Sequence, residues 1–366
     1  MDNPFKPSFG RTPPELLDRT DVLDEFEYGL SLRSGVLGLL TIITGARGVG
    51  KTVMLNEAQD LAREQGWAVI SDTSTDGFLA RIADAMSAIN DELGAGPPAR
   101  KITAFVAAGF GVTTQLPPER QVEFRSLGGQ LLRRLDENKT GLLTTLDEIQ
   151  DANRGELLHL AAVIQHFVRD GLPIGFVCAG LPSAVSNLLN EGVATFLRRA
   201  DKIDLHSVEI ADVESSYIKL FAAAGFTLPG NMASKAAIAT TGYPFLVQLI
   251  GYFLWREAEK TGGKLGDDAV DRAIAAGLQR NIRLVVEPAL ATTSRRDMDY
   301  LRAMAVDDGV SGTGNVAERM GAKLTLAANY RARLIDAGPI EAAGHGEVRF
   351  SIPGLRQYLR STPPRD

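Results

Sequence analysis

A glycine-rich stretch near residue 45 contains the residue types that hold phosphate groups in nucleotide-binding proteins. It reads G-x-x-x-x-G-K-T from Gly45 to Thr52 and follows an apolar run, 36–43, that predicts a buried strand. Glycines let the backbone turn its N–H groups toward phosphate oxygens, and the helix predicted for 52–65 adds the positive end of its dipole. We expect Lys51 to reach the β and γ phosphates of ATP and the Thr52 hydroxyl to bind Mg²⁺. The predicted nucleotide-binding residues are Gly45, Ala46, Arg47, Gly48, Val49, Gly50, Lys51, Thr52 and Val53.

An acidic pair follows a second apolar run further along the chain. Residues 141–146 predict a strand, and Asp147 and Glu148 come directly after it. We expect Asp147 to hold Mg²⁺ through water and Glu148 to polarise the attacking water as general base. The alternative is a solvated strand end, since acidic residues are common there. The catalytic interpretation requires both carboxylates to converge on Thr52.

The composition places the chain among ordinary globular proteins. Its 366 residues are enough for two or three domains, and its net charge of −6 disfavours a general nucleic-acid coat without excluding one basic module. Cys178, the only cysteine, lies in an apolar run and is expected to be a buried strand residue rather than a nucleophile. No secretion signal and no run long enough for a membrane span are present. We therefore expect a soluble, cytoplasmic protein without a disulfide within the chain.

Alternating strand and helix signals predict the fold class of the first half of the chain. After a helix expected over 16–32, apolar and amphipathic runs alternate, which is typical of an α/β fold with a parallel sheet covered by helices. The stretch 101–118 is apolar and is interpreted as a loop or hairpin insertion without an assigned role. The predicted strands are 36–43, 67–71, 141–146 and 174–179, and the predicted helices between them are 52–65, 77–93, 124–138 and 154–170.

The second half of the chain predicts helices and then one hairpin. Helical patterns at 212–224, 231–240, 244–260 and 267–281 predict a compact helical subdomain, which a link at 287–294 joins to the last part. Three short helical patterns there precede a hairpin, which together predict a winged helix-turn-helix. These are the helices 296–306, 314–320 and 325–337 and the strands 339–342 and 347–352. The predicted domains are a nucleotide-binding core over 1–206, a helical lid over 207–290 and a winged helix over 291–366.

The order of these parts resembles the AAA+/STAND group of P-loop ATPases, in particular archaeal-type and origin-initiator-like ATPases with a C-terminal winged helix. The resemblance implies ATP or ADP and Mg²⁺ as ligands, bound between core and lid. It places Leu17 and Arg19 beside the adenine, although Asp18 and Thr20 depart from the family pattern. The strand before Gly180 lacks the polar residue that senses the γ-phosphate in the family, so slow hydrolysis is expected.

Two further sites follow from the resemblance. Arg198 and Arg199 fall where relatives carry an arginine finger, which acts in cis or across a nucleotide-dependent homo-oligomer; a basic helix end or an ion pair is the alternative. Tyr243 and Pro244 belong to a Gly-x-Pro sequence like that of STAND proteins, whose proline contacts the base region. A proline that only starts the next helix is the alternative there.

The predicted winged helix has two possible partners. Helix 325–337 would enter the major groove of duplex DNA, and the candidate contacts to bases or phosphates are Lys323, Asn329, Arg331, Arg333, His345 and Arg349. In STAND proteins the same module often contacts protein instead.

Two functions therefore stay open at the level of sequence. The first is an ATPase that couples its nucleotide state to DNA binding. The second is a signalling or defence switch whose winged helix binds a protein partner or holds the switch off. That second class usually carries an added sensor or effector domain. We expect none in this sequence, which ends at Asp366 just after the predicted wing, and this favours the first function, although a separate partner protein could supply such a domain. A metabolic kinase is disfavoured, because Glu148 and the helical lid suit water activation and switching.

Overall fold

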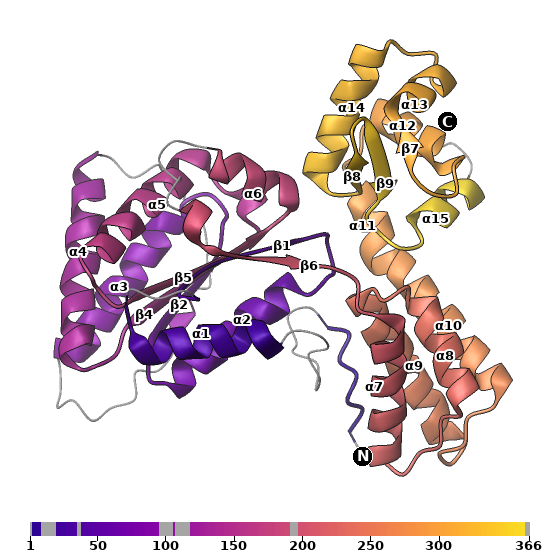
Figure 1. The fold of residues 1–366 in the computed structure, drawn as a ribbon, viewed down its shortest axis with the longest axis horizontal. Coiled ribbons are helices and arrows are strands. Elements are labelled where there is room, and N and C mark those ends of the chain that lie inside the picture. Colours follow the sequence, from indigo (N-terminus) through magenta and orange to yellow (C-terminus); the bar gives the residue numbers. More distant parts are fainter. Residues whose placement is uncertain are drawn as a thin grey trace. The chain divides into compact units, whose positions relative to one another are not determined.

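The computed structural model describes residues 2–8, 20–34, 38–94, 105–106, 118–190 and 197–362. The chain forms two compact units (Figure 1). One comprises the described parts of 19–45 and 51–205. The other comprises the described parts of 1–18, 46–50 and 206–366.

The first unit is built on a six-stranded sheet in the order β3-β2-β4-β5-β1-β6. Every neighbouring pair in this sheet is parallel, so the predicted α/β fold with a parallel sheet is confirmed. Parallel strands are normally covered on both faces, and β5 is buried along its whole length. The strands are β1 (Leu40–Gly45), β2 (Ala68–Thr73), β3 (Phe105–Val106), β4 (Leu142–Asp147), β5 (Ile174–Gly180) and β6 (Asp201–Leu205).

Helices pack around this sheet and close its core. The helix α1 contacts α2, while α3, α4 and α5 contact one another (Figure 1). Strand residues such as Ile42, Ile70 and Phe176 and helix residues such as Leu131 and Ile164 share one buried cluster. The helices are α1 (Thr20–Leu32), α2 (Lys51–Glu64), α3 (Phe78–Gly94), α4 (Pro118–Glu137), α5 (Arg154–Arg169) and α6 (Pro182–Leu189).

The sheet differs from the sequence prediction in its first strand. The strand β1 begins at Leu40 rather than at residue 36. Gly38 has a φ of +86° and its N–H donates to the Asp201 carboxylate at 2.6 Å, so the backbone turns there instead of extending.

Two edge strands were not predicted. Three of the five residues of the edge strand β6 are charged, so no apolar run marks it as a strand in the sequence. In the stretch 101–118, Phe105 and Val106 pair in parallel with β2, so this described part is an edge strand and not a hairpin.

The helical part of the second unit begins with a bundle of four helices, which lie where the sequence predicted four helices. Its helices are α7 (Ile210–Ala223), α8 (Gly230–Thr240), α9 (Pro244–Lys260) and α10 (Asp267–Asn281). The N-terminal residues 2–8 pack on this bundle through Phe5, which is 2% exposed and lies among Tyr217, Phe221 and Trp255. Gly251 makes this possible, because a Cβ there would lie 2.3 Å from the Phe5 ring.

The chain continues from the bundle into the C-terminal domain without leaving helical structure. A π-helical turn (Ile282–Val286) and α11 (Glu287–Leu290) follow α10 directly, so the predicted link 287–294 begins as helix. The Asn281 side chain donates to the Pro353 carbonyl at 2.9 Å. The bundle and the C-terminal domain are therefore linked by this hydrogen bond as well as by the continuous helical segment.

The C-terminal domain has the element order expected of a winged helix-turn-helix. Three helices precede a β-hairpin, and the short β7 adds a third strand in the antiparallel order β7-β9-β8. Tyr300, Leu301 and Met304 form its core with Val316 and Val348. The elements are α12 (Arg295–Ala305), β7 (Ser311–Gly312), α13 (Thr313–Arg319), α14 (Leu324–Ala337), β8 (Ile340–Gly344), β9 (Glu347–Phe350) and α15 (Leu355–Ser361).

Candidate functional site

The glycine-rich turn lies between the end of β1 and the start of α2. Gly48 and Gly50 have φ values of +75° and +97°, which side chains with a Cβ rarely adopt. Lys51 is 6% exposed, and its Nζ donates to the Gly45 carbonyl at 3.0 Å. The turn thus joins a buried strand to a helix N-terminus, which is the arrangement that binds phosphates in other proteins.

Asp147 lies beside Thr52 in the first unit. The Thr52 hydroxyl donates to an Asp147 carboxylate oxygen at 2.6 Å. Burial raises the pKa of Asp147, and the nearby Glu148 charge adds to the rise, while the Thr52 hydrogen bond opposes it. A buried carboxylate that is costly to ionise gains from a cation, and a hydroxyl beside it supplies a second oxygen.

The pair fits Mg²⁺ rather than a metal held entirely by protein. Among the described residues, no three His, Cys, Asp or Glu side chains form a group that could hold a metal ion. Mg²⁺ usually keeps several waters and takes one or two protein oxygens plus substrate phosphates. Thr52 and Asp147 would hold it at the phosphates.

Glu148 turns to a different partner. Its backbone has a φ of +56°, and its carboxylate accepts a hydrogen bond from the Gln150 side-chain amide. The Oε1 atom of the same Gln150 side chain in turn accepts from the Leu181 N–H, just after β5, at 3.1 Å. The convergence required by the sequence is therefore present for Asp147, whereas Glu148 is held by Gln150, a residue that sequence reasoning missed. Its only sequence signal is a polar side chain two positions after Glu148.

A second group missed by sequence reasoning organises the loop after β2. Arg81 donates to both oxygens of Asp72, at 2.9 and 2.7 Å, and to the carbonyls of Thr73, Thr75 and Asp76. Burial raises the pKa of Asp72 and Arg81 opposes that rise. The sequence signal was an acidic residue near a strand end with an arginine nine positions later.

This loop reaches the end of β4. Ser74 is fully buried and donates to the Asp147 carbonyl through both its N–H, at 3.0 Å, and its hydroxyl, at 2.5 Å. Arg81 therefore supports the backbone that carries Asp147.

Tyr243 contacts the glycine-rich turn within the second unit, to which residues 46–50 belong. Its hydroxyl donates to the Arg47 carbonyl at 2.6 Å. Pro244 occupies the first turn of α9, which both the base-contact prediction and the alternative of a helix-starting proline require. Leu17 and Arg19, predicted beside the adenine, lie outside the described residues.

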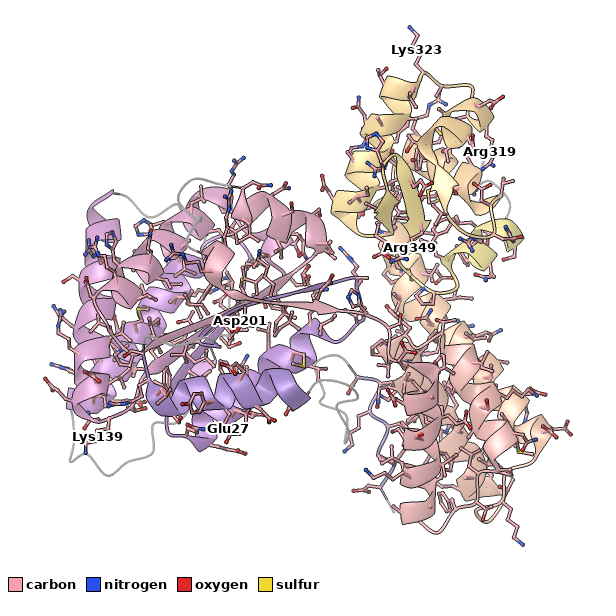
Figure 2. All side chains as sticks on the ribbon, viewed as in Figure 1. Glu27, Lys139, Asp201, Arg319, Lys323 and Arg349 are labelled. Carbon is pink, nitrogen blue, oxygen red and sulfur yellow. The ribbon has the colours of Figure 1, made fainter. Side chains whose placement is uncertain are left out.

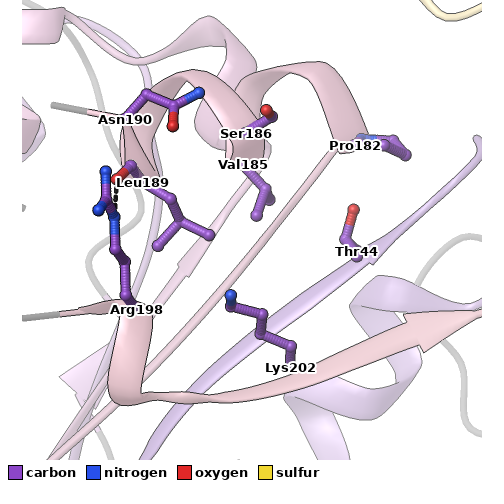
Figure 3. A pocket seen from close by; sticks show the side chains of 8 residues that line it. All are labelled: Thr44, Pro182, Val185, Ser186, Leu189, Asn190, Arg198 and Lys202. Atoms are coloured by element: carbon purple, nitrogen blue, oxygen red, sulfur yellow. Dashed lines mark hydrogen bonds between the residues drawn. The ribbon is translucent and has the colours of Figure 1, made fainter. Parts of the chain in front are cut away.

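Arg198 lies at a hollow of about 370 Å³ formed by β1, α6 and β6 (Figure 3). Its Nε donates to the Leu189 carbonyl at 2.8 Å, and Lys202 and Thr44 line the same hollow. Arg199 is exposed on the short helical turn before β6. The arginine-finger role of either residue stays a prediction.

Several residues predicted to contact DNA are engaged inside the C-terminal domain. Arg333 pairs with Asp297 at 2.6 Å and stacks on Tyr330, and Arg349 pairs with Glu341 at 2.5 Å. Arg331 donates to the Glu347 carbonyl at 3.4 Å.

The remaining candidates, Lys323, Asn329 and His345, are exposed. Lys323 projects from one end of the domain and Arg349 lies toward the other (Figure 2). Leu324 and Leu326, at the start of α14, are 60% and 44% exposed. This end of α14 therefore presents apolar as well as basic surface.

No described helix has both the length and the apolar character that crossing a bilayer requires. Among curated proteins, none matches the chain. A family model described as a domain of unknown function (DUF8462) matches residues 283–359, which include most of the π-helical turn and nearly all of the C-terminal domain.

Solved structures share the fold over almost the whole chain. The Walker-type ATPase PABY2304 of Pyrococcus abyssi is 16% identical, with a TM-score of 0.66 over 94% of this chain and 96% of that one. The ORC2 protein of Aeropyrum pernix, solved with ADPNP and ADP, is 16% identical, with a TM-score of 0.62 over 97% and 96%. CDC6P from Pyrobaculum aerophilum is 16% identical and has a TM-score of 0.51 over 97% and 96%. The chain thus has the α/β P-loop fold of these ATPases, as the sequence resemblance implied.

Proposed function

We propose that this chain is a Mg²⁺-dependent ATPase that couples its nucleotide state to the binding of duplex DNA through the C-terminal domain. The observation that carries the ATPase part is the pairing of Thr52 with Asp147 next to the glycine-rich turn. The shared fold with Walker-type and ORC2 proteins supports it.

The residues divide the chemistry among them. Backbone N–H groups of the turn and the Lys51 ammonium bind the phosphates, and Thr52 and Asp147 hold the metal. When bound there, Mg²⁺ would supply positive charge beside the phosphate oxygens. Glu148 takes a proton from the attacking water, for which it must exchange its Gln150 hydrogen bond for one to that water.

Substituting Glu148 by Gln tests the hydrolysis step. The neutral amide cannot accept the proton, so we expect phosphate release to fall by about 100-fold or more while ATP binding persists. Calorimetry would measure binding and a phosphate assay would measure turnover. Normal hydrolysis by Glu148→Gln would contradict the role of Glu148.

The DNA part rests on the element order of the C-terminal domain and on its exposed cations. Fluorescence anisotropy of labelled duplex DNA, without nucleotide, with ADP and with a non-hydrolysable ATP analogue, would test it. We expect affinity to depend on the nucleotide. Lys323→Ala should weaken binding and lower the salt slope by about 1, as for loss of one phosphate contact.

Lys264→Ala, an exposed lysine on the helical bundle, is the matched control and should leave affinity unchanged. Arg331→Ala would show whether α14 itself contributes.

A second candidate function is a switch whose C-terminal domain binds protein. It is favoured by exposed Leu324 and Leu326 and by the ion pairs of Arg333 and Arg349. The absence of DNA binding in every nucleotide state at low salt would support this candidate against the first.

A further inference from the structure

Tyr243 approaches the glycine-rich turn more closely than ordinary packing would require. Its hydroxyl lies 2.6 Å from the Arg47 carbonyl oxygen, and a Cβ built on Gly48 would be only 2.0 Å from that hydroxyl. Gly48 is therefore required for this approach as well as for its positive φ. The contact joins the N-terminus of α9 to the backbone predicted to bind phosphate.

The geometry of one peptide bond gives this contact its consequence. The bond between Arg47 and Gly48 is planar and trans, since the structure contains no cis peptide among the described residues. In a trans peptide the carbonyl and the following N–H point in opposite directions. A donor that holds the Arg47 carbonyl therefore holds the Gly48 N–H on the side away from Tyr243.

The Tyr243 backbone and side chain are held by hydrogen bonds and by packing. Its backbone N–H donates to the Thr240 carbonyl at 3.0 Å, and its side chain is 2% exposed. Gly242 has a φ of +70°, and its carbonyl accepts from the Val208 N–H at 2.8 Å. A Cβ on Gly242 would lie 2.1 Å from the Val208 carbonyl oxygen, so this close approach of the two backbone segments requires a glycine.

The hydroxyl also keeps its proton. Burial raises the pKa of Tyr243, although the positive charge of Arg47 opposes the rise. The phenol is therefore neutral at physiological pH and acts as a donor to the carbonyl.

We propose that Tyr243 is a positioning residue for nucleotide binding: its hydroxyl holds the Arg47–Gly48 peptide so that the Gly48 N–H faces the phosphates. This inference rests on the proposed nucleotide binding and gives Tyr243 a role through the turn rather than through the base. By linkage, phosphates that bind this N–H also stabilise the contact between the turn and α9.

Tyr243→Phe tests the role with little change in shape. We expect the Kd for ATP and ADP to rise about five- to tenfold, as for loss of one hydrogen bond. The matched control is Tyr217→Phe, which removes a 2.8 Å hydrogen bond to the Val247 carbonyl in the same bundle. It should leave the Kd within about twofold.

Tripolyphosphate distinguishes positioning of the turn from contact with the base. Positioning predicts that Tyr243→Phe weakens tripolyphosphate and ATP by the same factor, whereas a contact with the base predicts weaker ATP only.

Unchanged Kd values for tripolyphosphate and ATP in Tyr243→Phe, or a loss confined to ATP, would overturn the proposal while leaving the ATPase proposal standing. A wild-type protein that binds neither ATP nor ADP would instead overturn both.

Discussion

The predicted nucleotide-binding region and the C-terminal domain differ in how their predicted functional side chains are paired. Around the glycine-rich turn, residues predicted for chemistry lie beside one another, as Thr52 and Asp147 do. In the C-terminal domain, three of the six residues predicted to meet DNA have partners within the domain, namely Arg331, Arg333 and Arg349.

The difference has a physical origin. The glycine-rich motif specifies a backbone path, because only certain residues allow its φ values and its close approaches. An arginine on a helix specifies only a charge, and any nearby carboxylate can take it. Motifs of backbone shape are therefore better guides to a site than the types of its surface residues.

Lys51→Ala is expected to have the largest effect of these substitutions, a loss of affinity for ATP. It removes a buried cation that we propose binds the phosphates, so we expect ATP affinity to fall about 1,000-fold, or ~4 kcal/mol. Calorimetry on the folded variant would measure it. Lys264→Ala serves as control. Affinity within tenfold of wild type would show that the turn does not depend on Lys51.

Arg81→Ala challenges the comparison, because Arg81 is an ion-paired arginine in the nucleotide-binding region. The Asp72 side chain is 2% exposed and would be left without its partner, at a cost of about 3 kcal/mol in the free energy of unfolding. Urea denaturation would measure it. Arg81→Lys keeps the charge but not the two-pronged contact, and should fall between wild type and Arg81→Ala.

Asp147→Asn tests whether the carboxylate predicted to bind Mg²⁺ lowers the free energy of unfolding. Because burial raises the pKa of Asp147, the ionised carboxylate is disfavoured in the nucleotide-free fold. We expect the amide to raise the free energy of unfolding by about 0.5–2 kcal/mol at neutral pH and to abolish the Mg²⁺ dependence of ATP binding.

The pH dependence gives this prediction a second test. The folded state binds the Asp147 proton more tightly than the unfolded chain does. The wild type should therefore lose stability relative to Asp147→Asn as pH rises through the elevated pKa, and approach the variant below it. Parallel melting curves at every pH would contradict this.

Sequence alone predicted the parts of this molecule that depend on local pattern. The parallel sheet, the four bundle helices and the pairing of Asp147 with Thr52 follow from apolar runs and motif spacing. Gln150 and Arg81 escaped notice because their importance comes from partners that the fold supplies, Leu181 and the loop after β2. The edge strand β6 was not predicted because edge strands often carry charged residues, and those of β6 leave no apolar run in the sequence.

The smallest expected effect separates the two ion-paired arginines of the C-terminal domain. Asp297 has a side chain that is 12% exposed and Arg333 also stacks on Tyr330, so Arg333→Ala should cost about 1 kcal/mol of stability. Arg349 is 58% exposed and its pair with Glu341 is worth about 0–0.5 kcal/mol. Urea denaturation of the two variants would measure the difference.

A pair this weak can be exchanged for a phosphate at little cost, which makes Arg349 the better probe of DNA binding. Glu341→Gln frees Arg349 without removing a cation. If Arg349 meets DNA, that substitution should tighten binding about twofold at low salt, and Arg349→Ala should weaken it. If neither variant changes the affinity while Lys323→Ala lowers it, the DNA surface lies at the Lys323 end of α14 and the hairpin has no part in it.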